Sequence, residues 1–283
     1  MRNDFAVFIL THGRADRVIT VNTLRRCGYT GKIYLIIDDQ DNDEDEYYKR
    51  YGDSVIKFCK EDAAKESDVM DSDTDMRIVL YARNQCHRIA KELGLTYFLE
   101  LDDDYNEFRF RVQDGTTLTS VHMKHLDKVF DAMLDFLEVS GAVTVAFAQS
   151  GDFIGGIGSN VWRKQLARKA MNAFFCRTDR PFRFVGRVNE DVNTYTSLAH
   201  KGYLFFTLSD LNVNQGETQQ NSGGMTETYK QEGTYIKSFY TVMVCPSAVK
   251  ISTLSGGAAT RIHHKINWNR CAPKILRQEH KHV

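Results

Sequence analysis

The sequence contains few residues that would interrupt regular structure: its 283 residues include only three prolines, with no Pro/Ser-rich linker and no internal repeat. No apolar run approaches the roughly 20 residues that a membrane-spanning helix needs, and the apolar stretch at 5–10 is too short for a signal sequence. The six cysteines are scattered without a Cys-x-x-Cys pair. We therefore expect a cytoplasmic protein with free thiols and no membrane partner, and not a disulfide-rich, collagen-like or disordered chain.

A net charge of either sign is also lacking, because Lys plus Arg and Asp plus Glu both number 37. The balance is uneven, since residues 160–283 hold 18 basic and 8 acidic residues and residues 1–159 hold 19 and 29. A basic second half is typical of a protein that binds a polyanion on one face. Acidic loops in the first half, such as the seven acidic residues between Asp38 and Glu46, explain the same counts equally well.

The first hundred residues alternate between apolar runs of strand length and stretches with helical spacing. Strands are predicted at 5–10, 32–37, 55–59 and 96–101, and helices at 15–27, 43–51 and 77–93. This alternation predicts an α/β fold with a mostly parallel central sheet that is covered on both faces.

The second half is less regular, and its predicted elements are shorter. They are helices at 123–139, 191–200 and 229–244 (the last a helix or a mixed segment), strands at 142–148, 172–176, 183–185, 203–208 and 249–253, a polar loop at 212–224 and a basic tail from Arg261.

Parallel sheets bind ligands at the carboxyl ends of their strands, and polar residues gather there in this sequence. Thr11-His12-Gly13-Arg14 follows the first strand, Asp38-Asp39 the second and Asp102-Asp103-Asp104 the fourth. Asp102 and Asp104 lie two apart on an extended strand end and so point the same way. Adjacent carboxylates suit a hard cation such as Mg²⁺ or Mn²⁺, and a solvated acidic turn is the structural alternative.

The blocks with distinctive sequence run in order over nearly the whole chain. They are ILTHGRADRV at 9–18, GYTGKIYLIIDD at 28–39, YARN at 81–84, FLELDDDY at 98–105, QSGDFIGG at 149–156, RPFRFVGRVNEDVNTY at 180–195, QQNSGGMTETY at 219–229, KSFYTVM at 237–243 and RIHHKINW at 261–268. A strand followed by Asp-x-Asp near residue 100 is the signature of GT-A type nucleotide-sugar glycosyltransferases. The whole series resembles the TET/JBP-associated glycosyltransferases, the group that contains the base J glucosyltransferase and many bacteriophage proteins.

This resemblance implies a GT-A fold in one domain, residues 1–283, with a nucleotide-sugar half at 1–110 and an acceptor half at 111–283. It also implies a UDP-sugar donor, with glucose or arabinose as the sugar, and a divalent metal ion, Mn²⁺ or Mg²⁺. The donor-binding residues that it implies are Thr11, His12, Gly13 and Arg14, Asp38 or Asp39, Arg83, Asp102 and Asp103.

The resemblance further implies that a late histidine completes the metal site of Asp102 and Asp104. His263 and His264 are the candidates, because one of two adjacent histidines on a strand points inward. The alternative is that both are surface histidines in a basic tail.

Asn189-Glu190-Asp191 forms a second acidic cluster, at the expected start of a helix. By resemblance to inverting GT-A enzymes, Asp191 is the candidate general base and Glu190 a sugar-binding residue, although the two roles can be exchanged. The alternative is that Asp191 only caps the helix.

The acceptor that the resemblance implies is a 5-hydroxymethylpyrimidine base in DNA, in a phage pathway that protects DNA against host restriction. The protein would then work in the host cytoplasm. The candidate acceptor-binding residues are Arg180, Arg183, Arg187, Gln219 and Asn221. Two other hypotheses stay open: a transferase acting on a small molecule or a glycan, and an inactive GT-A domain used as a binding module.

Overall fold

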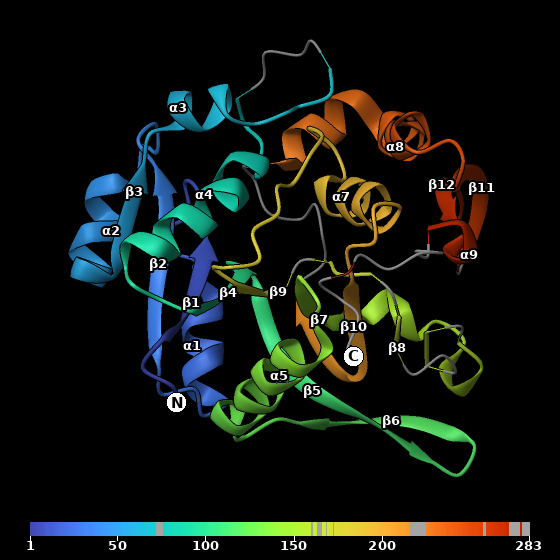
Figure 1. Ribbon diagram of the computed structural model, residues 1–283, viewed down its shortest axis with the longest axis horizontal. Helices are drawn as coiled ribbons and strands as arrows, with labels where there is room; N and C mark the ends of the chain where they lie inside the picture. The colour runs from blue at the N-terminus through green and yellow to red at the C-terminus, as the bar shows by residue number, and fades with distance from the viewer. Residues whose placement is uncertain are drawn as a thin grey trace.

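Four parallel strands form one half of the central sheet in the computed structural model of the chain (Figure 1). They are β1 (Phe5–Leu10), β2 (Lys32–Asp38), β3 (Val55–Phe58) and β4 (Tyr97–Asp102), in the order β3-β2-β1-β4. Every residue of β1 is buried, as a strand covered on both faces requires. The apolar runs of the sequence therefore predicted these four strands to within one residue at each end.

The structure describes most of the chain, and the statements below refer to this part. The described residues are 1–71, 76–159, 161–162, 166–167, 169–171, 173–215, 225–256, 259–271 and 278.

The sheet continues beyond β4 with strands of both directions, in the full order β3-β2-β1-β4-β9-β7-β10-β5-β6, and β8 pairs with β10. Strand β9 is antiparallel to β4 and to β7, and β10 is parallel to β7, so that β4, β7 and β10 all point the same way. The added strands are β5 (Tyr105–Asp114), β6 (Thr117–His122), β7 (Thr144–Gln149), β8 (Leu166–Ala167), β9 (Phe174–Arg177) and β10 (Phe205–Gln215). The predicted α/β class is thus confirmed, with a sheet that is parallel in its first half and mixed in its second.

Two apolar cores lie on opposite faces of this sheet, because successive residues of each strand point to opposite sides. Helices α1 (Ile19–Arg26) and α5 (Leu126–Ser140) cover the face of Phe5, Val7 and Ile9. The other face packs against α3 (Lys60–Lys65), α4 (Leu80–Glu92) and α7 (Glu190–Ala199). Each fully buried Leu, Ile or Phe contributes about 1.5–3 kcal/mol, so the two cores hold the strand ends firmly in place. Helix α2 (Glu44–Tyr51) lies at the outer side of the parallel strands (Figure 1).

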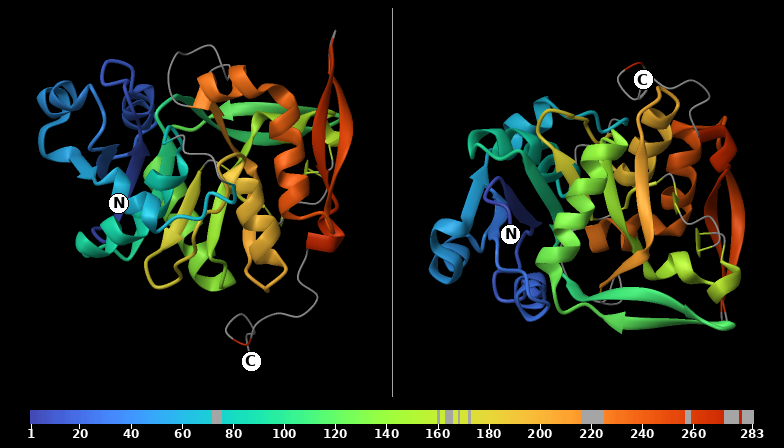
Figure 2. Two further views of the ribbon diagram at one scale, coloured as in Figure 1. Left: turned by 90° about the horizontal axis from the view of Figure 1, so that it is seen from above. Right: turned by 60° about the horizontal axis from the view of Figure 1, so that its bottom comes forward.

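A second, two-stranded sheet follows in the last part of the chain. Its strands β11 (Val249–Gly256) and β12 (Ala259–Ile266) are antiparallel and pack on helix α8 (Met225–Val244), and the short α9 (Trp268–Cys271) follows. Both views in Figure 2 show this hairpin at the end of the molecule away from the parallel strands. Within the described ranges, no helix is long and apolar enough to span a membrane.

Three predictions for the second half were wrong. Residues 183–185 form no strand, because the backbone N–H groups of Phe184 and Val185 donate to the side chains of Asn84 and Thr194 instead of to a strand. The predicted polar loop at 212–224 begins inside β10, which extends to Gln215. Residues 261–266, where the predicted basic tail starts, belong to strand β12.

Candidate active site

The segments that follow β1, β2 and β4 meet at one edge of the sheet. In the parallel register, Leu10 lies opposite both Ile36 and Asp102, so these strands end at nearly the same level. Thr20 in α1 fixes the turn after β4, since its hydroxyl donates to the carbonyl of Asp102 at 2.7 Å and its amide donates to that of Asp103 at 3.1 Å. The predicted gathering of polar residues at this edge is therefore present.

Asp103 joins the end of β4 to the loop after β1. Its two oxygens accept hydrogen bonds from the hydroxyl of Thr11 at 2.7 Å and from a guanidinium nitrogen of Arg14 at 3.0 Å. Burial raises the pKa of Asp103 above its usual value, even though Arg14 and Thr11 favour the charged form. Thr11 also contacts the hydroxyl of Tyr47 at 2.7 Å. Asp103 thus holds two loops together, and its oxygens are already occupied.

The predicted donor residues after β2 form a second polar group at this edge. His12 Nδ1 lies 2.8 Å from Asp38 Oδ2, and the hydrogen bond with this carboxylate raises the pKa of His12. The amide of Gly13, whose φ of 63° favours glycine, donates to Asp41 Oδ2 at 2.9 Å. Asp39 is exposed, and its side chain accepts from the amide of Lys60.

Asp104 has the features of a cation ligand. Its Oδ1 is buried and has no hydrogen-bond partner, and burial together with the neighbouring Asp102 and Asp103 raises its pKa to about 7. A divalent cation would remove this repulsion, and carboxylate oxygens are the ligands that Mg²⁺ and Mn²⁺ take together with phosphates. Asp102, whose side chain is 27% exposed, lies beside it at the same strand end. The two residues therefore fit the metal that the sequence implied.

His263 and His264 are not grouped with these carboxylates. They lie on β12, with their ring centroids 4.3 Å apart, and Nδ1 of His264 is buried without a hydrogen-bond partner. Burial, aided by His263 and Lys237, lowers the pKa of His264 to about 4. In the described part of the chain, no three His, Cys, Asp or Glu side chains come together as a metal site. The four predicted metal ligands are thus not assembled as one set within the described residues.

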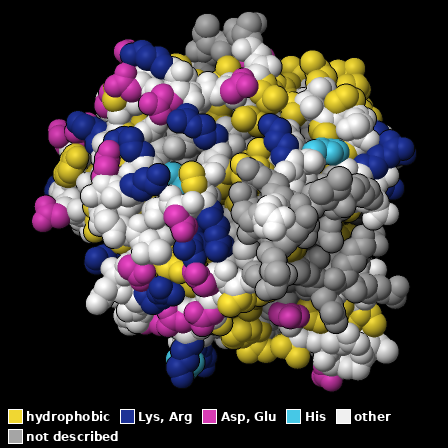
Figure 3. All heavy atoms as spheres, in the orientation of Figure 1, with side chains coloured by type: hydrophobic (Ala, Val, Ile, Leu, Met, Phe, Trp, Pro, Cys, Tyr) yellow, Lys and Arg dark blue, Asp and Glu magenta, His cyan; other side chains and the backbone are white. Residues whose placement is uncertain are grey.

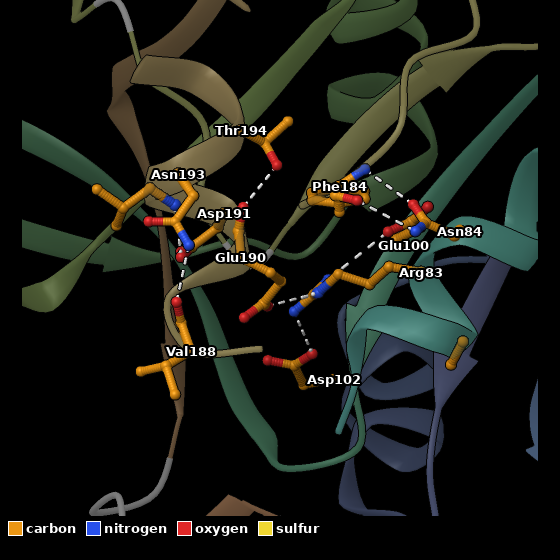
Figure 4. A network of polar contacts seen from close by, with 12 residues as sticks. Arg83, Asn84, Glu100, Asp102, Phe184, Val188, Glu190, Asp191, Asn193 and Thr194 are labelled. Atoms are coloured by element: carbon orange, nitrogen blue, oxygen red, sulfur yellow. Dashed lines mark hydrogen bonds and ion pairs between the residues drawn. The ribbon is translucent and has the colours of Figure 1, made fainter. Parts of the chain in front are cut away.

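Arg83 connects the end of β4 with the start of α7 (Figure 4). Its side chain is 2% exposed; Nε donates to Glu190 Oε1 at 3.0 Å and Nη2 to Asp102 Oδ1 at 3.1 Å. The rings of Phe174 and Phe184 enclose the guanidinium, with centroids at 5.1 and 5.6 Å. Burial opposes the positive charge, but the surrounding carboxylates outweigh it and raise the pKa of Arg83. Arg83 is therefore a buried residue and not an exposed arginine on the surface of α4.

Asp191 lies in the first turn of α7, next to Glu190, and is buried. Helix α7 begins at Glu190 with Asn189 before it, so Asp191 is not the N-cap residue, although its Oδ1 accepts from the amide of Val192 at 2.7 Å. Burial and the adjacent Glu190 carboxylate raise the pKa of Asp191 to about 7. A carboxylate with a pKa near neutrality can accept a proton and release it again, as a general base must.

Comparison with known proteins settles the family. The family model described as "TET-Associated Glycosyltransferase" matches residues 5–224. The chain belongs to this family of glycosyltransferases. No curated protein sequence matches it.

Solved structures show only distant likeness to this glycosyltransferase. Residues 1–349 of TarS from Staphylococcus aureus share 14% identity at a TM-score of 0.43, over 76% of this chain and 61% of that one. Glucosyl-3-phosphoglycerate synthase from Mycobacterium tuberculosis, in a complex with Mn²⁺, UDP and glucosyl-3-phosphoglycerate, shares 11% identity at a TM-score of 0.45, over 93% and 87%. The chain thus spans less than two thirds of the length of the TarS fragment.

The three arginines predicted to bind the acceptor do not form one exposed group in the transferase. Arg180 donates to the carbonyls of Leu137 and Ala142 at the end of α5, and Arg187 is buried and pairs with Asp71 at 3.0 Å. Arg183 is exposed, at 60%, and its side chain reaches Glu66. On the face in Figure 3, basic and acidic side chains lie intermixed over the elements of the first half. Gln219 and Asn221 lie outside the described residues.

Several residues at this edge of the sheet were not predicted from the sequence. Thr20, Asp41 and Lys60 hold the edge together, but a threonine in a helix and acidic or basic residues in a charged loop give no specific signal. Glu100 is different, because it interrupts the apolar run TYFLEL of a strand predicted to be covered on both faces. A charge at such a position demands a partner, and this signal was available.

Proposed function

We propose that the protein transfers a sugar from a UDP-sugar to the hydroxymethyl group of a 5-hydroxymethylpyrimidine base in DNA, with inversion at the anomeric carbon. The observation that carries this proposal is the pair of contacts made by Arg83. Its side chain binds both Asp102, a candidate metal ligand, and Glu190 in the first turn of α7. In this proposal, the donor binds beside Asp102 and the candidate base acts from the first turn of α7, on the other side of Arg83, as a displacement reaction requires.

The donor end of the site lies along the carboxyl ends of β1, β2 and β4. The loop of Thr11 to Arg14 and the Asp38 group would hold the nucleoside, with Gly13 permitting close backbone approach. Asp102 and Asp104 would hold Mn²⁺ or Mg²⁺, which supplies positive charge where the diphosphate leaves. Because Arg14 and Asp103 are already paired, their task is to keep this edge rigid.

The acceptor end is the start of α7. Asp191 would take the proton of the acceptor hydroxyl. The oxygen of that hydroxyl would bond to the anomeric carbon as the bond between this carbon and the UDP oxygen breaks. Glu190 is bound to Arg83, so it is suited to orienting the sugar and less suited to accepting the proton.

Support for a DNA acceptor comes from the family and from charge. The sequence resembles the group that contains the base J glucosyltransferase, and residues 160–283 carry a net charge of +10. The base would have to leave the duplex stack for its hydroxymethyl group to approach the donor.

A transfer assay tests the proposal. Labelled UDP-sugars, glucose and a pentose among them, are incubated with Mn²⁺ and with duplexes that contain 5-hydroxymethylcytosine, 5-hydroxymethyluracil or neither base. We expect label in the DNA only with a hydroxymethylated base, and an inverted product. Turnover of the donor that is equal with and without such DNA would favour a small-molecule or glycan acceptor, and no turnover of any donor would favour a binding module.

A further inference from the structure

Glu100 is a fully buried acid without a hydrogen bond. It lies in β4, two residues before Asp102, its exposed fraction is 0%, and neither carboxylate oxygen has a hydrogen-bond partner. Burying an ionisable group in this way is costly, and folds retain such groups only where another need outweighs the cost. No packing requirement explains it, since a leucine or methionine fills a similar volume.

One guanidinium nitrogen of Arg83 has no hydrogen bond, and it faces Glu100. Nε and Nη2 are engaged by Glu190 and Asp102, whereas Nη1 is buried without a hydrogen bond and lies 3.6 Å from Glu100 Oε2 (Figure 4). A hydrogen bond between such groups is about 2.9 Å long, so a shift of less than about 1 Å would form it.

The two carboxylates of β4 offer Arg83 an inner and an outer partner. Glu100 and Asp102 are two residues apart and so lie on the same face of the strand, but Glu100 is closed off from solvent while Asp102 is partly exposed at the edge. The rings of Phe174 and Phe184 limit the guanidinium to a small movement between these two partners.

We propose that Glu100 is a positioning residue that receives Arg83 when Asp102 turns to the metal and the donor diphosphate. This inference rests on the proposed function, because it requires Asp102 to be a donor-site ligand. Without Glu100, release of Asp102 would leave part of a buried positive charge unbalanced, and Arg83 would compete with the metal for Asp102. With Glu100 present, Arg83 keeps its hold on Glu190 and exchanges one carboxylate for the other.

Glu100→Gln tests this role, because the amide keeps the size of the side chain but cannot balance the arginine. We expect the Kd for Mn²⁺, measured by electron paramagnetic resonance of the free ion in the presence of UDP, to rise at least about 10-fold. KM for the donor should rise with it, while kcat at saturating donor and Mn²⁺ changes less. The thermal midpoint should change little, since Arg83 keeps its hydrogen bonds to Glu190 and Asp102 in this variant as long as no metal is bound.

Two further variants separate positioning from structure. Glu100→Asp keeps the charge and should restore part of the Mn²⁺ affinity, and Glu107→Gln, which removes a partly exposed partner of Arg109 on β5, should leave it unchanged. Wild-type Mn²⁺ affinity in Glu100→Gln, or a lowered thermal midpoint with no change in affinity, would overturn the inference. Wild-type protein that binds Mn²⁺ and UDP but transfers nothing to DNA would overturn the proposed acceptor alone, whereas protein that binds neither would overturn both proposals.

Discussion

Arg83 donates a 3.0 Å hydrogen bond to Glu190, which lies 107 residues further along the chain. The pair joins α4, which covers the parallel half of the sheet, to the first turn of α7, which carries Asp191. This buried guanidinium therefore helps to fix the end of β4 relative to the first turn of α7.

Replacing Arg83 by methionine should destabilise the protein strongly. Glu100, Asp102 and Glu190 would lose the cation that they share, and removing one partner of a buried ion pair costs about 3–5 kcal/mol. Urea unfolding followed by circular dichroism measures the loss. Arg88→Met is the matched control on the same helix, because Arg88 is half exposed, forms its ion pair with the exposed Glu92 and donates a hydrogen bond to Gln85, so the change should cost far less than Arg83→Met. Equal effects of the two variants would contradict the structural role given to Arg83.

Asp104→Asn should remove metal-dependent transfer without harming the fold. The variant loses a metal ligand, and we expect transfer to fall at least about 10²-fold. It also relieves repulsion among three adjacent carboxylates, so the thermal midpoint should stay the same or rise. Transfer is measured with labelled donor, with and without excess EDTA. Asp114→Asn, at the exposed end of β5, is the control. Full activity in EDTA would refute the metal site.

The pH dependence of turnover should report on Asp191. Burial and Glu190 raise its pKa to about 7, so the carboxyl is protonated below that pH and cannot accept the proton of the acceptor. With saturating substrates, kcat should therefore rise between about pH 6 and 8 and level off above. Asp191→Asn should lower kcat by about 10²–10⁴-fold and abolish this rise, with little change in donor affinity. The exposed Asp210→Asn is the control. A flat profile in the wild type, or loss of activity only in Glu190→Gln, would assign the base elsewhere.

Arginine substitutions should separate DNA contact from folding. Arg183 is exposed, so Arg183→Glu should weaken binding to DNA and reduce its salt dependence while the thermal midpoint stays near that of the wild type. Arg180→Glu should instead lower the thermal midpoint, because Arg180 binds carbonyls at the end of α5. Fluorescence anisotropy with a labelled duplex at several salt concentrations measures the first effect. Undiminished DNA binding by Arg183→Glu would remove the last of the three predicted arginines from the acceptor site.

The sequence predicted well the elements whose burial is simple. Strands β1 to β4 are continuous apolar runs, and Asp102 to Asp104 lie where such a sheet places ligands. The hairpin of β5 and β6 was not predicted, because it has no continuous apolar run. In YNEFRFRVQD, charged and polar residues alternate with a few apolar ones, and the hairpin lies at the edge of the sheet. Sequence spacing also does not show which side chains meet when they are far apart along the chain. The pairing of Arg83 with Glu190 and the contact of Arg180 with the end of α5 were therefore visible only in the structure.

The contacts that close the site have a consequence for the order in which it can form. Arg83 reaches Glu190, Arg187 reaches Asp71 over 116 residues, and the hydroxyl of Tyr240 donates to the carbonyl of Val69 over 171 residues. Ribosomes release the chain from its N-terminus, so the first four strands emerge long before α7 and α8. During that interval Arg83 can contact Glu100 and Asp102 on β4, but Glu190 and the candidate base Asp191 have not yet emerged. A nascent chain or a fragment that ends before residue 190 should therefore be unable to transfer sugar, and full activity should appear only with the slow, long-range step of folding.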